Sequence, residues 1–265
     1  MPYTVFKEKR IYYTDSGQGQ PIVLLHGFTE SQKIWNRFVK ILSDEFRIIT
    51  IDLPGHGKSE CAAEVHTMEL LADVVHAVLK KAGIKKCIMT GHSMGGYVTL
   101  AYARKYPKKL KGICIFHSHC FADSAEDKEN RDRVIEVVRN DKFRFIVNFI
   151  PNLFPEEVQN KFEKEIEGLV KEAERMPKEG IIAALEGMKL RKDQTSLLAT
   201  TKLPVLFILG LRDSKAPVPK LWEMITLPVH SESLILRDVG HMGYIESPKE
   251  TIQAIRNFVL NHSGS

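Results

Sequence analysis

The feature that most constrains the fold is a short apolar run that leads into Gly91-x-Ser93-x-Gly95. Residues 87–90 are long enough only for a buried strand, and residues 94–102 have the apolar spacing of a helix that packs on a sheet. A strand that turns this sharply into a helix brings its flanks so close that side chains beside the serine would collide. The two glycines remove those side chains. The pattern therefore predicts that Ser93 lies exposed at the carboxyl end of a strand.

Elsewhere the chain alternates between apolar runs of strand length and amphipathic stretches of helix length. Residues 3–6 and 11–14 predict a hairpin at a sheet edge, and the run 21–25 predicts the first buried strand. Further strands are expected at 46–51, 87–90, 110–116, 203–209 and 233–236, and helices at 31–42, 69–82, 94–106 and 251–260. This alternation is typical of an α/β fold, in which helices flank a mostly parallel central sheet.

The alternation is interrupted between residues 120 and 200. This segment contains no convincing strand, and its apolar residues keep the spacing of several short helices. We therefore predict two units: a core formed by residues 1–119 and 201–265, and an inserted α-helical cap formed by residues 120–200.

Charge and cysteine content limit the kinds of partner and compartment. The net charge is +5, but the lysines are scattered over several segments and indicate solvated faces, so no nucleic-acid partner is predicted. The sequence has neither an apolar signal region at its start nor an apolar run of membrane-spanning length, which predicts no membrane association. The four cysteines lack metal-ligand spacing and are expected to be free thiols, which favours a cytoplasmic protein.

Two residues downstream of Ser93 have the chemistry that a nucleophilic serine requires. A serine hydroxyl is a weak nucleophile at neutral pH and needs a base, which in turn needs a group that orients it. Asp213 follows the strand expected at 203–209, and His241 follows the last expected strand. Because the carboxyl ends of parallel strands lie along one edge of a sheet, we expect Ser93, Asp213 and His241 to converge there.

With the order Ser, Asp, His and several further motifs, the chain resembles the α/β-hydrolase superfamily. The motifs are His26-Gly27-Phe28, the run Asp52-Leu53-Pro54-Gly55-His56-Gly57-Lys58-Ser59, the serine segment, Gly210-Leu211-Arg212-Asp213 and Gly240-His241. It is most similar to the capped serine hydrolases, a group of esterases and carbon–carbon hydrolases. Epoxide hydrolases are related but have an aspartate at the position of Ser93.

The resemblance implies a role for each matching residue. Ser93 is expected to be the nucleophile, His241 the general base and Asp213 the acid that orients His241, with Asp123 as the rival acid. The backbone N–H groups of Phe28 and Met94 are expected to form the oxyanion hole.

Four more residues are predicted to contact substrate, and no cofactor is expected. They are Gly27, His92, His117 and His119. The alternation of His117 and His119 raises the possibility of a metal site, but because no third ligand has suitable spacing, we predict no metal.

The sequence favours hydrolysis of a small to medium carboxylic ester through an acyl-enzyme. A carbon–carbon bond hydrolase, a lactonase or amidase, and a perhydrolase use the same three side chains and stay open as alternatives. A receptor that retains these residues and turns its ligand over slowly is a further alternative of another class. The expected partner is a small molecule, and the expected assembly is a monomer or a homodimer.

Overall fold

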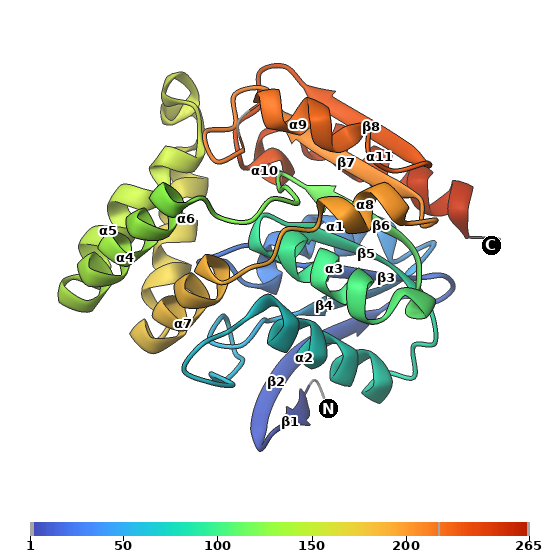
Figure 1. The fold of residues 1–265 in the computed structure, drawn as a ribbon, viewed down its shortest axis with the longest axis horizontal. Coiled ribbons are helices and arrows are strands. Elements are labelled where there is room, and N and C mark those ends of the chain that lie inside the picture. Colours follow the sequence, from blue (N-terminus) through green and yellow to red (C-terminus); the bar gives the residue numbers. More distant parts are fainter. Residues whose placement is uncertain (1–2, 217, 264–265) are drawn as a thin grey trace.

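A sheet of eight strands forms the centre of the molecule (Figure 1). The computed structural model describes residues 3–216 and 218–263, the side chains of 218–220 excepted. The order across the sheet is β1-β2-β4-β3-β5-β6-β7-β8, with the β1–β2 and β2–β4 pairs antiparallel and the remaining pairs parallel. The strands are β1 (Tyr3–Phe6), β2 (Lys9–Ser16), β3 (Pro21–Leu25), β4 (Arg47–Ile51), β5 (Cys87–His92), β6 (Leu110–Phe116), β7 (Val205–Gly210) and β8 (Ser231–Leu236). The predicted α/β fold, including its edge hairpin, is confirmed.

Helices cover both faces of the sheet and bury an apolar cluster on each. One face is covered by α1 (Asn36–Leu42), α10 (Gly243–Glu246) and α11 (Pro248–His262). The other is covered by α2 (Met68–Lys81), α3 (Met94–Lys105), α8 (Thr195–Thr200) and α9 (Val218–Ile225). Burial of apolar side chains on both faces explains why the central strands are continuously hydrophobic in sequence.

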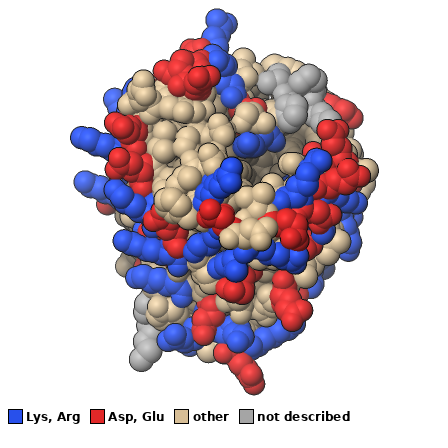
Figure 2. Space-filling model, turned by 90° about the vertical axis from the view of Figure 1, so that its left-hand side faces the viewer, with Lys and Arg blue, Asp and Glu red and all other residues tan. Residues whose placement is uncertain are grey.

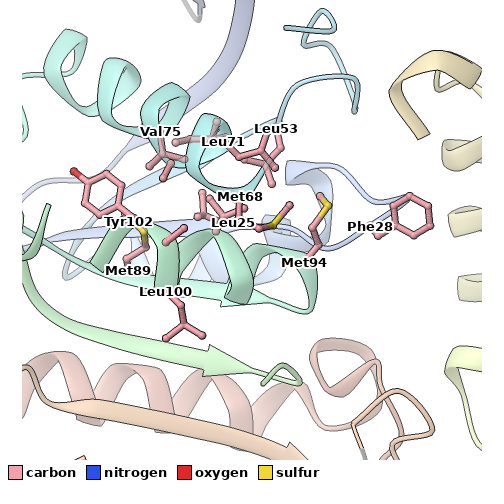
Figure 3. Packing of buried hydrophobic residues seen from close by; sticks show 14 of the residues in the cluster. Leu25, Phe28, Leu53, Met68, Leu71, Val75, Met89, Met94, Leu100 and Tyr102 are labelled. Atoms are coloured by element: carbon pink, nitrogen blue, oxygen red, sulfur yellow. The ribbon is translucent and has the colours of Figure 1, made fainter. Parts of the chain in front are cut away.

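One of these clusters reaches from the sheet towards the segment between β6 and β7. Figure 3 shows Leu71 and Val75 of α2 on one side of Leu25 and Met89, which come from β3 and β5. Phe28 belongs to the same cluster, but its ring points away from the other labelled side chains. It packs instead against Phe149, with ring centroids 5.7 Å apart.

The segment between β6 and β7 is helical throughout its regular structure and lies beyond the carboxyl ends of the strands (Figure 1). Its elements are α4 (Ala125–Asn140), α5 (Lys142–Phe149), η3 (Pro151–Leu153), η4 (Glu156–Val158), η5 (Asn160–Phe162), α6 (Glu163–Glu174) and α7 (Lys178–Lys189), followed by α8. Its last helix, α8, contributes Leu198 to a cluster shared with the sheet. The division into a core and a cap at residues 120 and 200 stays a prediction.

Helix α7 contacts the loops at Gly55 and His66 through backbone atoms. The His66 N–H donates to the Ala183 carbonyl at 2.9 Å. A Cβ atom at Gly187 would lie 1.8 Å from the His66 carbonyl oxygen, and one at Gly180 would lie 2.5 Å from the Gly55 carbonyl oxygen. These separations are far below van der Waals contact, so only glycine permits this approach at either position.

The remaining differences from the sequence prediction are local. The helix expected at 31–42 begins as the 3-10 helix η1 (Gln32–Trp35), where the Ser31 side chain accepts from the Lys33 N–H. A second 3-10 turn, η2 (Pro107–Lys109), precedes β6.

All four cysteines are free thiols. No helix within the described residues combines the length and the apolar character that crossing a membrane requires.

Candidate active site

Ser93 sits at a sharp turn between β5 and α3. Its backbone has φ 50° and ψ −115°, a left-handed conformation that is costly for a residue with a side chain. A Cβ at Gly91 would lie 2.1 Å from the Gly95 carbonyl oxygen, and one at Gly95 would lie 2.5 Å from the Leu25 carbonyl oxygen. The turn is therefore possible only because both positions are glycine, as the sequence pattern predicted.

His241 joins Ser93 to Asp213. The Nε2 atom of His241 lies 2.9 Å from Ser93 Oγ, and its Nδ1 atom lies 3.0 Å and 2.9 Å from the two carboxylate oxygens of Asp213. Both His241 and Asp213 are buried. Three side chains separated by up to 148 positions in sequence thus form one hydrogen-bonded chain at the carboxyl edge of the sheet.

Asp213 binds a second histidine as well. His117 Nδ1 lies 3.2 Å from Asp213 Oδ2, and the Lys215 N–H donates to Asp213 Oδ1 at 2.8 Å. Burial alone would raise the pKa of Asp213, but attraction to His241 and hydrogen bonds from both histidines lower it well below its usual range. The carboxylate is therefore ionised and accepts hydrogen bonds only.

His117 is itself buried and neutral. Burial lowers its pKa to about 4, against the opposing hydrogen bond to Asp213. Because Asp213 only accepts, the ring proton lies on Nδ1, and Nε2 is a buried atom with no hydrogen-bond partner among the described residues. This imidazole faces away from the cavity and supports the carboxylate from behind.

Two backbone N–H groups near Ser93 have no acceptor. Within residues 3–216 and 218–263, the N–H groups of Phe28 and Met94 donate no hydrogen bond. Met94 is the first residue of α3, where backbone N–H groups have no intrahelical partner and the helix dipole favours negative charge. Gly27, beside Phe28, approaches so closely that a Cβ there would lie 3.1 Å from the Ser93 Cβ.

His92, directly before Ser93, is fully buried behind the turn. Its Nδ1 lies 3.0 Å from Glu30 Oε2, and its Nε2 lies 2.9 Å from the backbone carbonyl oxygen of His241. Glu30 also accepts the Gly27 N–H at 2.5 Å and the Tyr244 hydroxyl at 3.0 Å. One buried carboxylate thus connects the loop after β3, the serine turn and the segment around His241.

A cavity of about 540 Å³ opens above Ser93 and His241. Of the four residues predicted to contact substrate, His119 lines it, whereas Gly27, His92 and His117 are not among its lining residues. The lining comes from both predicted units. The apolar members on the helical segment are Phe121, Ala122, Val134, Phe145, Phe149, Leu185 and Met188. The Phe28 side chain also lines this cavity and packs on Phe145 and Phe149.

The rival acid, Asp123, has other partners. It forms ion pairs with Arg131 and with Arg191, the latter at 2.5 Å. It makes no hydrogen bond to His241 in the described part of the chain. The geometry therefore favours Asp213 over Asp123 as the partner of His241.

One group of side chains has the spacing of metal ligands. Donor atoms of His117, Asp213 and His241 lie within 4.8 Å of one another. Both histidines already direct Nδ1 at the Asp213 carboxylate, so a cation would have to displace the hydrogen bonds that hold this group together. We interpret it as a hydrogen-bonded cluster.

Sequence reasoning missed Glu30 and the two arginines. Glu30 has no periodic or motif signal; its only distinguishing feature is a charge three residues after Gly27, in a loop expected near the serine. Arg131 and Arg191 are two among many charged residues of the helical segment, and nothing in their spacing indicates that they meet at one carboxylate.

Comparisons with known proteins by family model, by sequence and by structure all find similar hydrolases. Residues 20–248 match the family model described as alpha/beta hydrolase fold. The chain is 30% identical over 257 residues to a pimeloyl-[acyl-carrier protein] methyl ester esterase of Aeromonas hydrophila, covering 92% of this chain and 96% of that protein. A malate-bound structure of a thermophilic esterase from Thermogutta terrifontis superposes with a TM-score of 0.92 at 35% identity, covering 98% of this chain and 97% of that one. An enol-lactonase from Burkholderia xenovorans has the same fold, with a TM-score of 0.90 at 21% identity and coverage of 98% and 100%.

Proposed function

We propose that this chain, which belongs to the alpha/beta hydrolase fold family, hydrolyses carboxylic esters through an acyl-enzyme on Ser93. The observation that carries the proposal is the hydrogen-bonded chain Ser93–His241–Asp213 beneath a cavity large enough for a small to medium ester. The similar proteins that are named esterases support the same reaction class.

In the proposed first half-reaction, Ser93 Oγ attacks the ester carbonyl while His241 Nε2 takes the hydroxyl proton. Asp213 holds His241 with its proton on Nδ1 and stabilises the imidazolium that forms. The unpaired N–H groups of Phe28 and Met94 then receive the negative charge on the carbonyl oxygen. Each such donor contributes about 3 kcal/mol of transition-state stabilisation. His241 returns the proton to the leaving alcohol.

In the second half-reaction, water replaces the alcohol. His241 takes a proton from that water, the hydroxide attacks the acyl carbon, and the proton returns to Ser93 as the acid leaves. All proton transfers pass through one nitrogen, His241 Nε2, which lies 2.9 Å from Ser93 Oγ. No step requires a cofactor.

We propose further that residues 120–200 act as the cap that selects the substrate. Phe145 and Phe149 of α5 stack with ring centroids 5.1 Å apart and pack against Phe28, which lines the same cavity. This aromatic wall is apolar and lies beside the proposed oxyanion donors. His119, hydrogen-bonded to Tyr97 at 3.1 Å, lines the same cavity and is the proposed polar contact for substrate.

Labelling with a fluorophosphonate tests the nucleophile. We expect wild type to be labelled and Ser93→Ala to remain unlabelled. Ser214→Ala is the matched control, because Ser214 lines the same cavity and should not affect labelling. An unlabelled wild type, or a labelled Ser93→Ala protein, would contradict the proposal.

Turnover assays test the reaction class. p-Nitrophenyl esters of increasing acyl length should be hydrolysed, and a vinylogous diketone offered to the same enzyme should be cleaved much more slowly. The opposite preference would assign the same three side chains to carbon–carbon bond hydrolysis.

A further inference from the structure

The cavity above Ser93 has charged side chains in its lining as well as aromatic ones. Three cations line it, Arg131, Arg191 and Lys215, against two carboxylates, Asp123 and Asp127. The lining therefore carries one positive charge in excess. Figure 2 shows the molecule from the side of the segment between β6 and β7, where Lys and Arg atoms border a hollow of uncharged side chains.

Asp123 is shared between two guanidinium groups. Its side chain is 2% exposed, and it accepts from Arg131 Nε and Nη2 and pairs with Arg191 Nη1 at 2.5 Å. One carboxylate balances only one of the two cations. A cation without a counter-charge in a partly desolvated site is unfavourable in free energy. The two arginines therefore favour binding of an anion in the cavity.

Arg191 is held in place before any ligand binds. Its side chain is 5% exposed, its Nε donates to the Phe121 carbonyl at 2.9 Å, and its Nη1 donates to the Met188 carbonyl at 3.2 Å. The guanidinium also lies over the Tyr97 ring, 4.3 Å from its centroid. An anion that binds here would not bear the usual entropic cost of ordering an arginine side chain.

Arg191 keeps one donor group free. Among the described residues, Nη2 makes no hydrogen bond, although the other nitrogens of the same guanidinium do. It is not one of the fully buried side-chain atoms that lack a partner, so it keeps some exposed surface, and Arg191 lines the cavity. A guanidinium that is held through Nε and Nη1 and keeps Nη2 free is suited to bind a carboxylate.

Lys215 is a second cation near the reacting groups. Its N–H donates to Asp213, and its ammonium lies 5.6 Å from the centroid of Phe149, on the aromatic wall. It forms no ion pair within the part of the chain that the structure describes. Lys215 therefore contributes positive potential beside the proposed acyl site, whereas Arg191 offers a rigid binding group.

We propose that the ester this chain hydrolyses bears a carboxylate, which Arg191 binds while Ser93 attacks the ester carbonyl. The substrate class is the half-ester of a dicarboxylic acid. The proposal rests on the proposed function, because it assigns a second group to the substrate of the same site. Arg191 acts here as a specificity residue, and Lys215 adds long-range attraction.

The test compares two esters that differ only in charge. Monomethyl esters of dicarboxylic acids, from succinate to suberate, are each paired with a neutral methyl ester in which an isopropyl group replaces the carboxylate. Continuous titration of the released acid with base measures the initial rate of hydrolysis. The rates at several ester concentrations give kcat/KM for both members of each pair. For the best chain length, we expect wild type to favour the charged member by about tenfold, as one charge-assisted hydrogen bond provides.

The variants locate the recognition. Arg191→Gln should abolish the preference for the charged ester, and Arg191→Lys should restore part of it. Arg133→Gln makes the same charge change on α4, but Arg133 is exposed and absent from the cavity lining, so the preference should stay. Because the readout is a ratio within each variant, a partial loss of folded protein does not affect it.

Each remaining outcome contradicts part of the proposal. A wild type that prefers the neutral ester at every chain length would overturn it, while still supporting ester hydrolysis. A preference that survives Arg191→Gln but is lost in Lys215→Gln would overturn the assignment to Arg191. Absence of turnover of both esters, together with an unlabelled Ser93, would instead reject the proposed function.

Discussion

The imidazole of His92 lies between the Glu30 carboxylate, 3.0 Å from its Nδ1, and the His241 carbonyl oxygen, 2.9 Å from its Nε2. Both neighbours are acceptors, so both ring nitrogens carry protons and the ring is positively charged. Burial alone would lower the pKa of His92, but Glu30 and the His241 carbonyl outweigh it and raise that pKa. A buried ion pair thus connects the loop of Gly27 and Phe28 to the loop that holds the proposed base.

Glu30→Gln should reduce kcat while leaving KM nearly unchanged. The carboxylate accepts hydrogen bonds from Gly27, His92 and Tyr244, whereas the amide has a single acceptor oxygen. The segments that carry these three residues would therefore lose hydrogen bonds to a shared partner. We expect kcat to fall by at least about tenfold, which corresponds to one hydrogen bond to a charged group. Steady-state kinetics measures both constants.

The control for this change is Glu45→Gln, which removes an exposed ion pair with Arg256. It should leave kcat unchanged, because exposed pairs contribute little. If Glu30→Gln raises KM and preserves kcat, Glu30 does not position the reacting groups.

His117→Asn should have a much smaller effect than His241→Asn. His117 supports Asp213 from behind the cavity and transfers no proton in the proposed mechanism. We expect kcat to fall only several-fold, against a loss of at least about a hundredfold for the proposed general base.

A pH profile separates the two histidines further. Because the pKa of His117 is about 4, its ring stays neutral above that pH and adds no limb to the rate profile between pH 5 and 9. The pH–rate profile of His117→Asn should therefore have the same shape as that of wild type in this range. A limb that is present in wild type and absent from this variant would show that His117 titrates with activity.

Acid should destabilise the fold through four buried histidines. Burial lowers the pKa of His26, His66 and His117 to about 4 and that of His56 to about 3. Below the unfolded value of about 6.5, the unfolded chain binds protons that the folded chain does not. Between pH 7 and 4.5 the free energy of unfolding should fall by roughly 2 kcal/mol for each histidine. Urea denaturation at several pH values measures this slope.

His56→Gln should flatten that slope by about a quarter, since it removes one of the four titrating groups. His92 acts in the opposite direction: its raised pKa gives stability that is present at low pH and lost as the pH rises through the folded value. An unfolding free energy that does not change between pH 7 and 4.5 would contradict the assignment of neutral histidines.

Gly91→Ala should prevent correct folding of the serine turn. The added Cβ would lie 2.1 Å from the Gly95 carbonyl oxygen, which is backbone and cannot move aside without opening the turn. We expect a large loss of thermal stability and of activity. Gly168→Ala is the matched control, because a Cβ in that helical position meets nothing within 4 Å and should stabilise the protein by about 0.5–1 kcal/mol.

The strands, the serine turn and the positions of Asp213 and His241 were predictable because each depends on local pattern. A buried parallel strand must be apolar, and a turn this tight must exclude side chains. The strand ends then meet at one edge of the sheet by topology alone. For this reason three distant residues could be placed together without any knowledge of their side-chain contacts.

Glu30 and the arginine pair on Asp123 were not predictable, because their partners come from loops and helices with no pattern that links them. His92 and His117 were expected in the substrate pocket since they adjoin strand ends. Strand pleating instead directs His92 inward, to Glu30, and the left-handed backbone of His117, with φ 46°, turns its ring towards Asp213. Such orientations depend on single dihedral angles, which sequence spacing does not contain.

The backbone contacts of α7 with the loops at Gly55 and His66 limit where this protein can acquire new specificity. Substitutions at Gly180 or Gly187 would separate the two surfaces, so the position of α7 is fixed relative to these loops. Helices α4 and α5 carry the aromatic wall and Arg131 without such contacts to these loops. Diversification of substrate range, by evolution or by directed mutagenesis, should therefore concentrate on α4 and α5 and spare α7.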